Sequence, residues 1–195
     1  LGHAACTAFL LQAGADVNAV NRTGDSALHL AALAGSTACA SLILEAGGKV
    51  NCATFSSASW LTFAGEFTPL HLAAKARAPG LVAALLEAGA NVHAVTSDRS
   101  TAMHYAASRG DDATLRVLVK AGGSVNVQND QGNTPLHSAA TEGSEACIAT
   151  LLQAGAVATV TNKWRTSALL HAATRGYAGC VDLLLKAGAD PNCAD

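Results

Sequence analysis

The sequence predicts an all-α repeat solenoid, in which helix-turn-helix units stack in a row and carry hairpin fingers. Six glycines close Leu- and Val-rich stretches at steps of 33, 42, 33, 33 and 33 residues: Gly14, Gly47, Gly89, Gly122, Gly155 and Gly188. Capping-type residues recur in the same phase: Ser26, Thr68, Thr101, Thr134 and Ser167. Repetition at a period near 33 indicates an array of small units, each stabilised by contact with its neighbours.

One unit, residues 129–161, shows how each element is predicted. Turn-forming residues at 129–133 predict the tip of a finger. Thr134 is placed to cap a short first helix, which Gly143 ends. Apolar residues at helical spacing then predict a second helix over about 144–153. The remaining units repeat this order.

The same phase gives the boundaries along the whole chain. We expect a partial unit over 1–20, followed by units over 21–53, 54–95, 96–128, 129–161 and 162–195. The unit over 54–95 carries a nine-residue insertion in its finger, which explains the step of 42. Because both ends fall inside units, we expect the array to be part of a longer chain. We also expect the array to be monomeric.

Composition limits the kind of partner. Half of the 195 residues are hydrophobic but only 4% are aromatic, which suits thin layers of closely packed helices. A net charge of −2 provides no basic field for nucleic acid. No apolar run approaches the roughly 20 residues needed to cross a bilayer. We therefore expect neither nucleic-acid binding nor membrane insertion.

The six cysteines are predicted to be neither disulfides nor metal ligands. Four occupy one repeating apolar position and are expected to be small buried hydrophobes: Cys6, Cys39, Cys147 and Cys180. Stacked helices lie about 10 Å apart, whereas a disulfide needs Cα atoms within about 7 Å. There is no Cys-x-x-Cys pair. Unpaired thiols favour an intracellular setting, cytoplasmic or nuclear.

These motifs resemble the ankyrin repeat family over the whole chain. The segments TPLHLAA at 68–74, TPLH at 134–137 and GADVN at 14–18 match the pattern of that family. The resemblance implies a curved stack of helix pairs with β-hairpin fingers on one side. It implies that partners bind the fingers and the concave surface formed with the first helices. It also implies that four histidines bond locally to the turn backbone: His29, His71, His104 and His137.

The chain departs from the pattern at several positions. Charged residues replace the tip glycine in three fingers: Glu66, Arg99 and Arg165. A non-glycine residue at positive φ costs on the order of 1 kcal/mol, so we expect those tips to be reshaped. Arg77 replaces the glycine between two helices, and we expect that linker to differ. Leu170 replaces the fifth histidine and His171 follows it, which leaves a local rearrangement open.

No catalytic arrangement stands out. The sequence shows no nucleophile with a base beside it, no phosphate-binding glycine loop and no inward carboxylate pair. We expect no enzyme activity, no cofactor and no metal site.

Aromatic residues gather at two finger tips. The insertion region, 52–67, holds four of the eight aromatic residues: Phe55, Trp60, Phe63 and Phe67. These rings either fold back onto adjacent fingers or anchor a partner, since aromatic residues are enriched at binding hot spots. Trp164 lies at another predicted tip between Lys163 and Arg165. The same two interpretations apply to it.

Charge is distributed unevenly over the predicted array. Basic residues outnumber acidic ones by eight to five on the tips and first helices, whereas acidic residues outnumber basic ones by eight to four on second helices and outer loops. One interpretation is ordinary solvated surface. The other is a site for an acidic or phosphorylated peptide across the middle repeats, near Lys75, Arg77, Arg99 and Arg109.

We therefore predict a non-catalytic protein–protein interaction module that binds a protein or peptide on its concave and finger face. The alternative is a structural spacer or scaffold segment of a larger multidomain protein. The predicted partner-binding residues are Arg22, Asp25, Trp60, Phe67, Lys75, Arg77, Asp98, Arg99, Arg109, Gln131, Lys163, Trp164 and Arg175.

Overall fold

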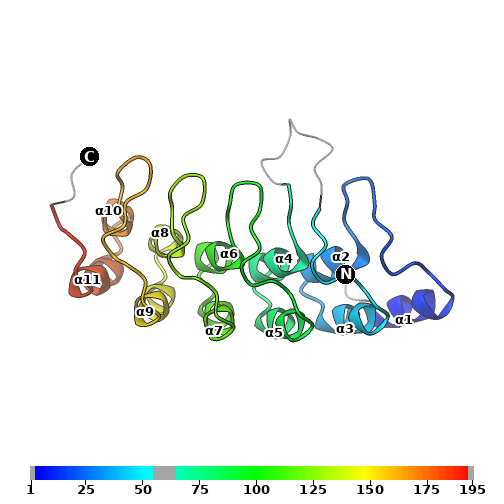
Figure 1. Ribbon diagram of the computed structural model, residues 1–195. Coiled ribbons are helices and arrows are strands. Elements are labelled where there is room, and N and C mark those ends of the chain that lie inside the picture. The colour runs from blue at the N-terminus through cyan, green and yellow to red at the C-terminus, as the bar shows by residue number, and fades with distance from the viewer. Residues whose placement is uncertain (1–2, 55–64, 193–195) are drawn as a thin grey trace. The chain divides into compact units, whose positions relative to one another are not determined.

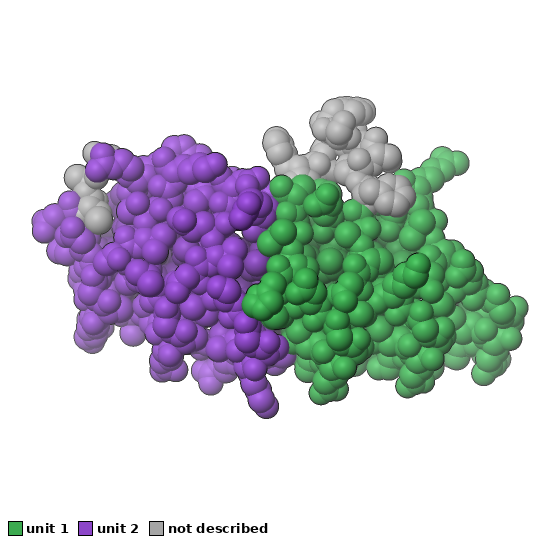
Figure 2. Space-filling model, in the orientation of Figure 1, with its two compact units in different colours: residues 1–97 green, residues 98–195 purple. Residues whose placement is uncertain are grey.

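The computed structural model describes residues 3–54 and 65–192, and these form eleven helices and no strand (Figure 1). The chain divides into two compact units, Leu1–Ser97 and Asp98–Asp195, coloured separately in Figure 2. Each unit is an all-α stack of helix pairs, as the periodicity predicted. Three calls on the insertion, Phe55, Trp60 and Phe63, lie outside the described residues.

The first unit contains one single helix and two pairs. Its helices are α1 (Ala4–Gln12), α2 (Ala27–Leu33), α3 (Thr37–Glu45), α4 (Pro69–Lys75) and α5 (Pro79–Glu87). The first helix of each pair, α2 or α4, packs against the second, α3 or α5. Neighbouring pairs join through α2 on α4 and α3 on α5, while α1 packs on α3.

The second unit contains three pairs. Its helices are α6 (Ala102–Ser108), α7 (Asp112–Lys120), α8 (Pro135–Glu142), α9 (Glu145–Gln153), α10 (Ala168–Thr174) and α11 (Ala178–Lys186). First helices form one layer and second helices the other, with the fingers extending beyond the first layer (Figure 1). No helix among the described residues is long and apolar enough to cross a membrane.

The first helices begin at the predicted capping residues. Thr134 and His137 form a reciprocal capping box, in which the Thr134 backbone N–H donates to His137 Nδ1 over 3.2 Å. The opposite nitrogen of the ring, Nε2, lies 3.2 Å from the carbonyl oxygen of Thr166 in the next finger. His104 makes the equivalent bond to Asn133. These histidines therefore fix the start of a helix and also join it to the following repeat.

The Ala-Ala pairs of the first helices fill the core as expected. Ala73, Ala74, Ala106 and Ala107 have no exposed surface. Small side chains there let neighbouring helices approach closely, and a larger residue would overpack the layer.

The expectation that charged residues reshape the tips and the linker is wrong. Glu66, Arg99 and Arg165 keep the left-handed conformation of the glycines they replace, with φ of 68°, 60° and 59°. Arg77 does the same in its linker, with φ of 58°. Turn hydrogen bonds and packing outweigh a strain of about 1 kcal/mol per residue.

The insertion enters its finger without changing the pairing at its base. Thr54 N–H donates to the Phe67 carbonyl over 2.9 Å, and Glu66 N–H donates to the Thr54 carbonyl over 2.9 Å. Asn21, Gly24 and Asp25 make the same two bonds in the preceding finger. The described fingers are closed by such turns and by isolated bridges at Val20–Ser26 and Thr161–Ser167, without strand ladders.

The departure at Leu170 causes no rearrangement. Helix α10 has seven residues, as α2 and α4 have, and Ser167 Oγ accepts a hydrogen bond from the Leu170 backbone N–H over 3.2 Å. His171 packs edge-on against His137, with ring centroids 5.9 Å apart. Nε2 of His171 is buried without a hydrogen-bond partner.

The cysteine predictions hold for three of the four positions. Cys39, Cys147 and Cys180 are buried, but Cys6 is exposed. Cys6 lies on α1 at the edge of an open pocket, where no further helix pair of the described residues covers it. Cys193 lies outside the described residues.

Candidate partner-binding surfaces

An exposed tryptophan, Trp164, lies at a finger tip of the second unit. Its residue surface is 62% exposed. Its backbone N–H donates to Asn162 Oδ1 over 3.0 Å, and the same oxygen accepts from Thr166 N–H. Asn162 is itself buried. The ring therefore extends into solvent from a turn whose backbone is held in one conformation.

The neighbouring finger supports this tip. Lys163 N–H donates to the Gln131 carbonyl over 3.0 Å. A Cβ atom on Gly132 would lie 2.9 Å from the Lys163 nitrogen, so only glycine fits this close approach. Gln131, Lys163 and Arg165 are all exposed. We call Gln131, Lys163, Trp164 and Arg165 the tip face.

A polar depression lies below the fingers of the second unit. It has a volume of about 190 Å³ and is lined by Ser108, Asn133, His137, Ser138, Thr141 and Glu142. Arg109 follows α6 and Arg175 follows α10, and both are exposed. The only charged side chain lining the depression is the Glu142 carboxylate. An anionic partner therefore meets a more favourable field at the tip face than in the depression.

The first unit holds a second group of predicted residues. Phe67 is buried, with 8% exposure, and meets the His71 ring edge-on at a centroid distance of 6.2 Å. The Lys75 ammonium lies 5.6 Å from the centre of the Phe67 ring, within the range of a cation–π contact. Phe67 therefore packs inside the array and is not available as an anchor. Lys75 and Arg77 are exposed.

Two predicted acidic residues stabilise their own fingers. Asp25 Oδ2 accepts a hydrogen bond from Asn21 Nδ2 over 3.1 Å. Asp98 Oδ2 accepts one from Ser100 Oγ over 2.9 Å. Both carboxylates thus have structural partners.

The structure divides the thirteen predicted partner-binding residues between the units. Arg22, Asp25, Phe67, Lys75 and Arg77 belong to the first. Asp98, Arg99, Arg109, Gln131, Lys163, Trp164 and Arg175 belong to the second. Trp60 lies outside the described residues. The predicted peptide site takes two residues from each unit: Lys75 and Arg77 from the first, Arg99 and Arg109 from the second.

The buried histidines of the second unit are structural. Burial lowers the pKa of His104, and it lowers the pKa of His137 from 6.5 to about 4. Both rings are therefore neutral at neutral pH. Among the described residues, no three His, Cys, Asp or Glu side chains are grouped closely enough to hold a metal ion.

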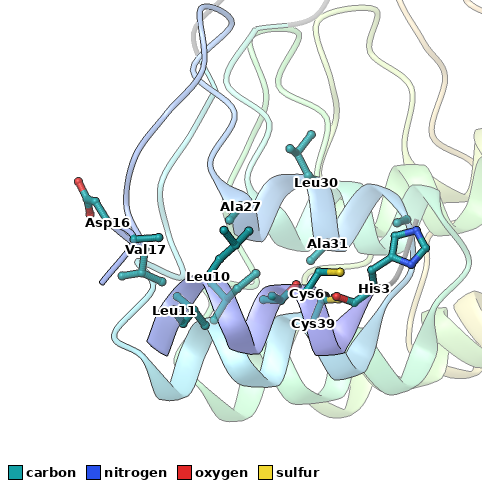
Figure 3. A pocket seen from close by; sticks show the side chains of 14 residues that line it. His3, Cys6, Leu10, Leu11, Asp16, Val17, Ala27, Leu30, Ala31 and Cys39 are labelled. Atoms are coloured by element: carbon teal, nitrogen blue, oxygen red, sulfur yellow. Dashed lines mark hydrogen bonds between the residues drawn. The ribbon is translucent and has the colours of Figure 1, made fainter. Parts of the chain in front are cut away.

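Sequence reasoning missed an apolar pocket in the first unit, shown in Figure 3. Its volume is about 330 Å³, and Leu10 and Leu11 of α1, Leu30 of α2 and Cys39 of α3 line it. Leu10 and Leu30 are 62% and 52% exposed. The available signal was that residues 1–20 contribute only a second helix, so part of α2 has no first helix beside it.

Sequence reasoning also missed a contact between a thiol and an imidazole. Cys52 Sγ lies 3.8 Å from His29 Nδ1. The two residues are separated by 23 positions in the sequence, a spacing that also relates the other capping histidines to apolar residues. That register was the signal that could have revealed the contact.

Comparison with known proteins supports the architecture. The family model described as ankyrin repeats in three copies matches residues 1–96, 70–162 and 103–195. A search among curated proteins found no match. The family matches together span the whole chain, and the helix pairs, capping boxes and fingers agree with them. The chain therefore belongs to the ankyrin repeat family.

Proposed function

We propose that the chain is a non-catalytic protein–protein interaction module that binds an acidic or phosphorylated segment of a partner at the tip face. Ankyrin repeats are generally modules for protein–protein interaction and are typically non-catalytic, which supports the class of function. The observation that carries the specific proposal is Trp164, 62% exposed between Lys163 and Arg165. We propose an intracellular setting, cytoplasmic or nuclear, because the described cysteines are unpaired.

Trp164 has the properties of a binding hot spot. Tryptophan and arginine are enriched where a few residues carry most of the binding energy. The hydrogen bonds that Asn162 Oδ1 accepts from the backbone N–H groups of Trp164 and Thr166 fix the turn before a partner arrives. A fixed backbone reduces the entropy lost on binding. The ring can therefore contribute its buried area with little reorganisation.

The charges around the tip face favour an anionic partner. On the fingers and first helices of the second unit, five basic residues stand against three acidic ones: Arg99, Arg109, Lys163, Arg165 and Arg175 against Asp98, Asp130 and Glu142. Asp98 already accepts a hydrogen bond from Ser100. Arginine guanidinium groups bind carboxylate and phosphate oxygens through paired hydrogen bonds. A partner with a phosphate beside an aromatic side chain would bind both the basic residues and the Trp164 ring of the tip face.

The first unit offers a second, smaller basic surface. Lys75 and Arg77 are exposed there, with Arg22 at another finger. The contact between Lys75 and Phe67 restricts the lysine side chain near the base of the inserted finger. We propose that Lys75 and Arg77 form a separate contact surface of the first unit for an acidic segment.

A library of acidic and phosphorylated peptides, with unphosphorylated and basic counterparts, tests this proposal. Enriched peptides should bind the Trp164→Ala variant roughly 30-fold more weakly than the wild type, which corresponds to about 2 kcal/mol. Lys163→Glu combined with Arg165→Glu should weaken acidic peptides selectively, and added salt should weaken the wild type. Val157→Ala, at another exposed apolar residue of the second unit, is the matched control.

The outcomes separate the two functions considered. Peptides that bind equally well to wild type and Trp164→Ala would exclude the tip face as the site. Failure of wild type to enrich any peptide would favour a structural spacer. Circular dichroism should show the same helix content for all variants, since the substituted side chains are exposed.

A further inference from the structure

Two arginines of the second unit occupy the same strained position in fingers that are two repeats apart. Arg99 and Arg165 are both exposed, and both have positive φ, 60° and 59°. Gly132 holds the equivalent position in the finger between them, with φ of 79°. Because glycine adopts this conformation readily, the turn forms without a side chain at this position. Strained backbone of this kind clusters at functional sites.

Both guanidinium groups can bind a ligand. Among the described residues, neither Arg99 nor Arg165 takes part in an ion pair. The carboxylate next to Arg99, Asp98, accepts hydrogen bonds from the backbone N–H and the hydroxyl of Ser100. An arginine binds a carboxylate or a phosphate through two parallel hydrogen bonds. Each of the two fingers therefore presents an anion-binding group to solvent.

Backbone hydrogen bonds hold the three fingers of the second unit in a row. Asp130 N–H donates to the Asp98 carbonyl over 2.9 Å, and Lys163 N–H donates to the Gln131 carbonyl over 3.0 Å. The middle finger is therefore joined to the finger on either side of it, as the row in Figure 1 shows. Stacked helix pairs are displaced by about 10 Å per repeat. Equivalent positions two repeats apart are thus separated by roughly 20 Å.

The middle finger carries the opposite charge. Asp130 is exposed there. Gly132 adds no side chain, and a Cβ atom at this position would lie 2.9 Å from the Lys163 nitrogen. Lys163 adds positive charge to the finger of Arg165. Along the row, the exposed charges are therefore positive at Arg99, negative at Asp130 and positive at Arg165, and the negative charge opposes an anion in the middle.

We propose, building on the proposed function of the tip face, that the second unit recognises two anionic residues of one partner segment. One binds at Arg165 in the tip face and the other at Arg99. An extended chain advances about 3.3 Å per residue, so the two anionic residues lie about six positions apart in the partner. The residues between them are neutral or basic, because they pass Asp130. The second contact raises affinity because it is made within the same complex.

Peptides with one and two anionic residues test this proposal. The starting peptide is one that the library enriches, that has a single anionic residue and that Trp164→Ala weakens. A phosphoserine is added about two, four, six, eight or ten residues away on either side, with glycine, alanine and serine between. Fluorescence anisotropy measures the Kd of each peptide and of its counterpart with serine at the added position. The ratio of these two Kd values is the gain from the second anion. It should be on the order of tenfold near a spacing of six and clearly smaller at two and ten.

Three variants locate the second contact. Arg99→Gly should abolish the gain at every spacing, because the added phosphate then lacks its guanidinium. Glycine suits positive φ, so this variant should show the helix content of wild type by circular dichroism. Lys120→Ala removes one exposed positive charge from α7 and is the matched control, which should keep the gain. An aspartate midway between the two anions should weaken binding to wild type more than binding to Asp130→Asn.

The outcomes separate the second contact from the tip face itself. A gain that is equal at all spacings, or that survives Arg99→Gly, would overturn the two-anion proposal and leave the tip face as a binding site. A wild type that enriches no peptide, or only peptides that Trp164→Ala binds equally well, would overturn the proposed function and the second contact together. A maximum near six residues that Arg99→Gly removes and Lys120→Ala keeps would support both.

Discussion

The capping histidines of the two units occupy the same position in the repeat but differ in their proton affinity. His29 in the first unit and His137 in the second both accept the N-cap backbone N–H at Nδ1. The pKa of His29 is raised, while that of His137 is lowered to about 4. The difference follows the residue 23 positions later, Cys52 in one case and Val160 in the other. Cys52 and Asp25 are among the groups that raise the pKa of His29, whereas burial and the neighbouring His171 and His104 lower that of His137.

The linkers between paired helices show a second difference. Arg77 takes a glycine-like conformation in the first unit, with φ of 58° and an exposed side chain. At the equivalent place in the second unit, a Cβ on Gly143 would lie 2.7 Å from the ring of Tyr177. The same backbone turn thus accepts arginine in one repeat and requires glycine in another.

The largest expected effect concerns His137 and acid. Since its pKa is lower in the folded protein than in the unfolded chain, the unfolded chain takes up the proton first as the pH falls. The stability that neutral His137 contributes is fully present above pH 6.5 and is lost as the pH falls toward about 4. The loss is on the order of 3 kcal/mol for this residue. His29 acts in the opposite sense, because its raised pKa adds stability at low pH that disappears as the pH rises.

Thermal unfolding at pH 7 and pH 4.5 measures this effect. His137→Gln keeps an acceptor for the Thr134 N–H and a donor for the Thr166 carbonyl but cannot titrate. Its acid destabilisation should be clearly smaller than that of wild type. Equal pH dependence in both proteins would show that His137 is not the source.

The linker comparison predicts an intermediate effect. Gly143→Ala should reduce the free energy of unfolding by about 2 kcal/mol, because positive φ and contact with Tyr177 both oppose the new methyl group. Arg77→Gly should instead change the free energy of unfolding by less than about 1 kcal/mol. Glycine releases the backbone strain in the folded protein, but it also raises the conformational entropy of the unfolded chain, and the two effects oppose each other. Urea unfolding of the two variants checks the difference. A Gly143→Ala protein as stable as wild type would show that Tyr177 moves aside without loss.

The smallest change in stability is expected for Cys52→Val. This substitution gives the first unit the residue type that the second unit has at the equivalent positions, Val127 and Val160. Removing the thiol should lower the pKa of His29, since the interactions that outweigh its burial are lost. An NMR titration of the His29 ring protons measures the shift. An unchanged titration would mean that Cys52 does not control this histidine. Stability should change by less than about 1.5 kcal/mol, as for other swaps of similar volume.

Much of the fold could be predicted because the elements of the repeat are determined by interactions between residues close in sequence. Thr134 starts a helix and Gly155 follows one through bonds within a few residues. The tolerance of Arg99 and Arg165 for positive φ could not be predicted, since it depends on how firmly the surrounding turn is held. The exposure of Trp164 was one of two interpretations. Phe67, two residues before helix α4, shows that an aromatic residue near a finger can equally be buried.

The sequence by itself determined the period, the family and the helix pairs of this protein, because caps, glycines and apolar spacing act over short distances. Only the tertiary structure decided which thiol lies beside an imidazole and which tip residue lacks a neighbour to pack on. Those properties depend on contacts between residues about one repeat apart. Each such contact combines desolvation, charge and available space, and the local pattern of either repeat does not contain that information.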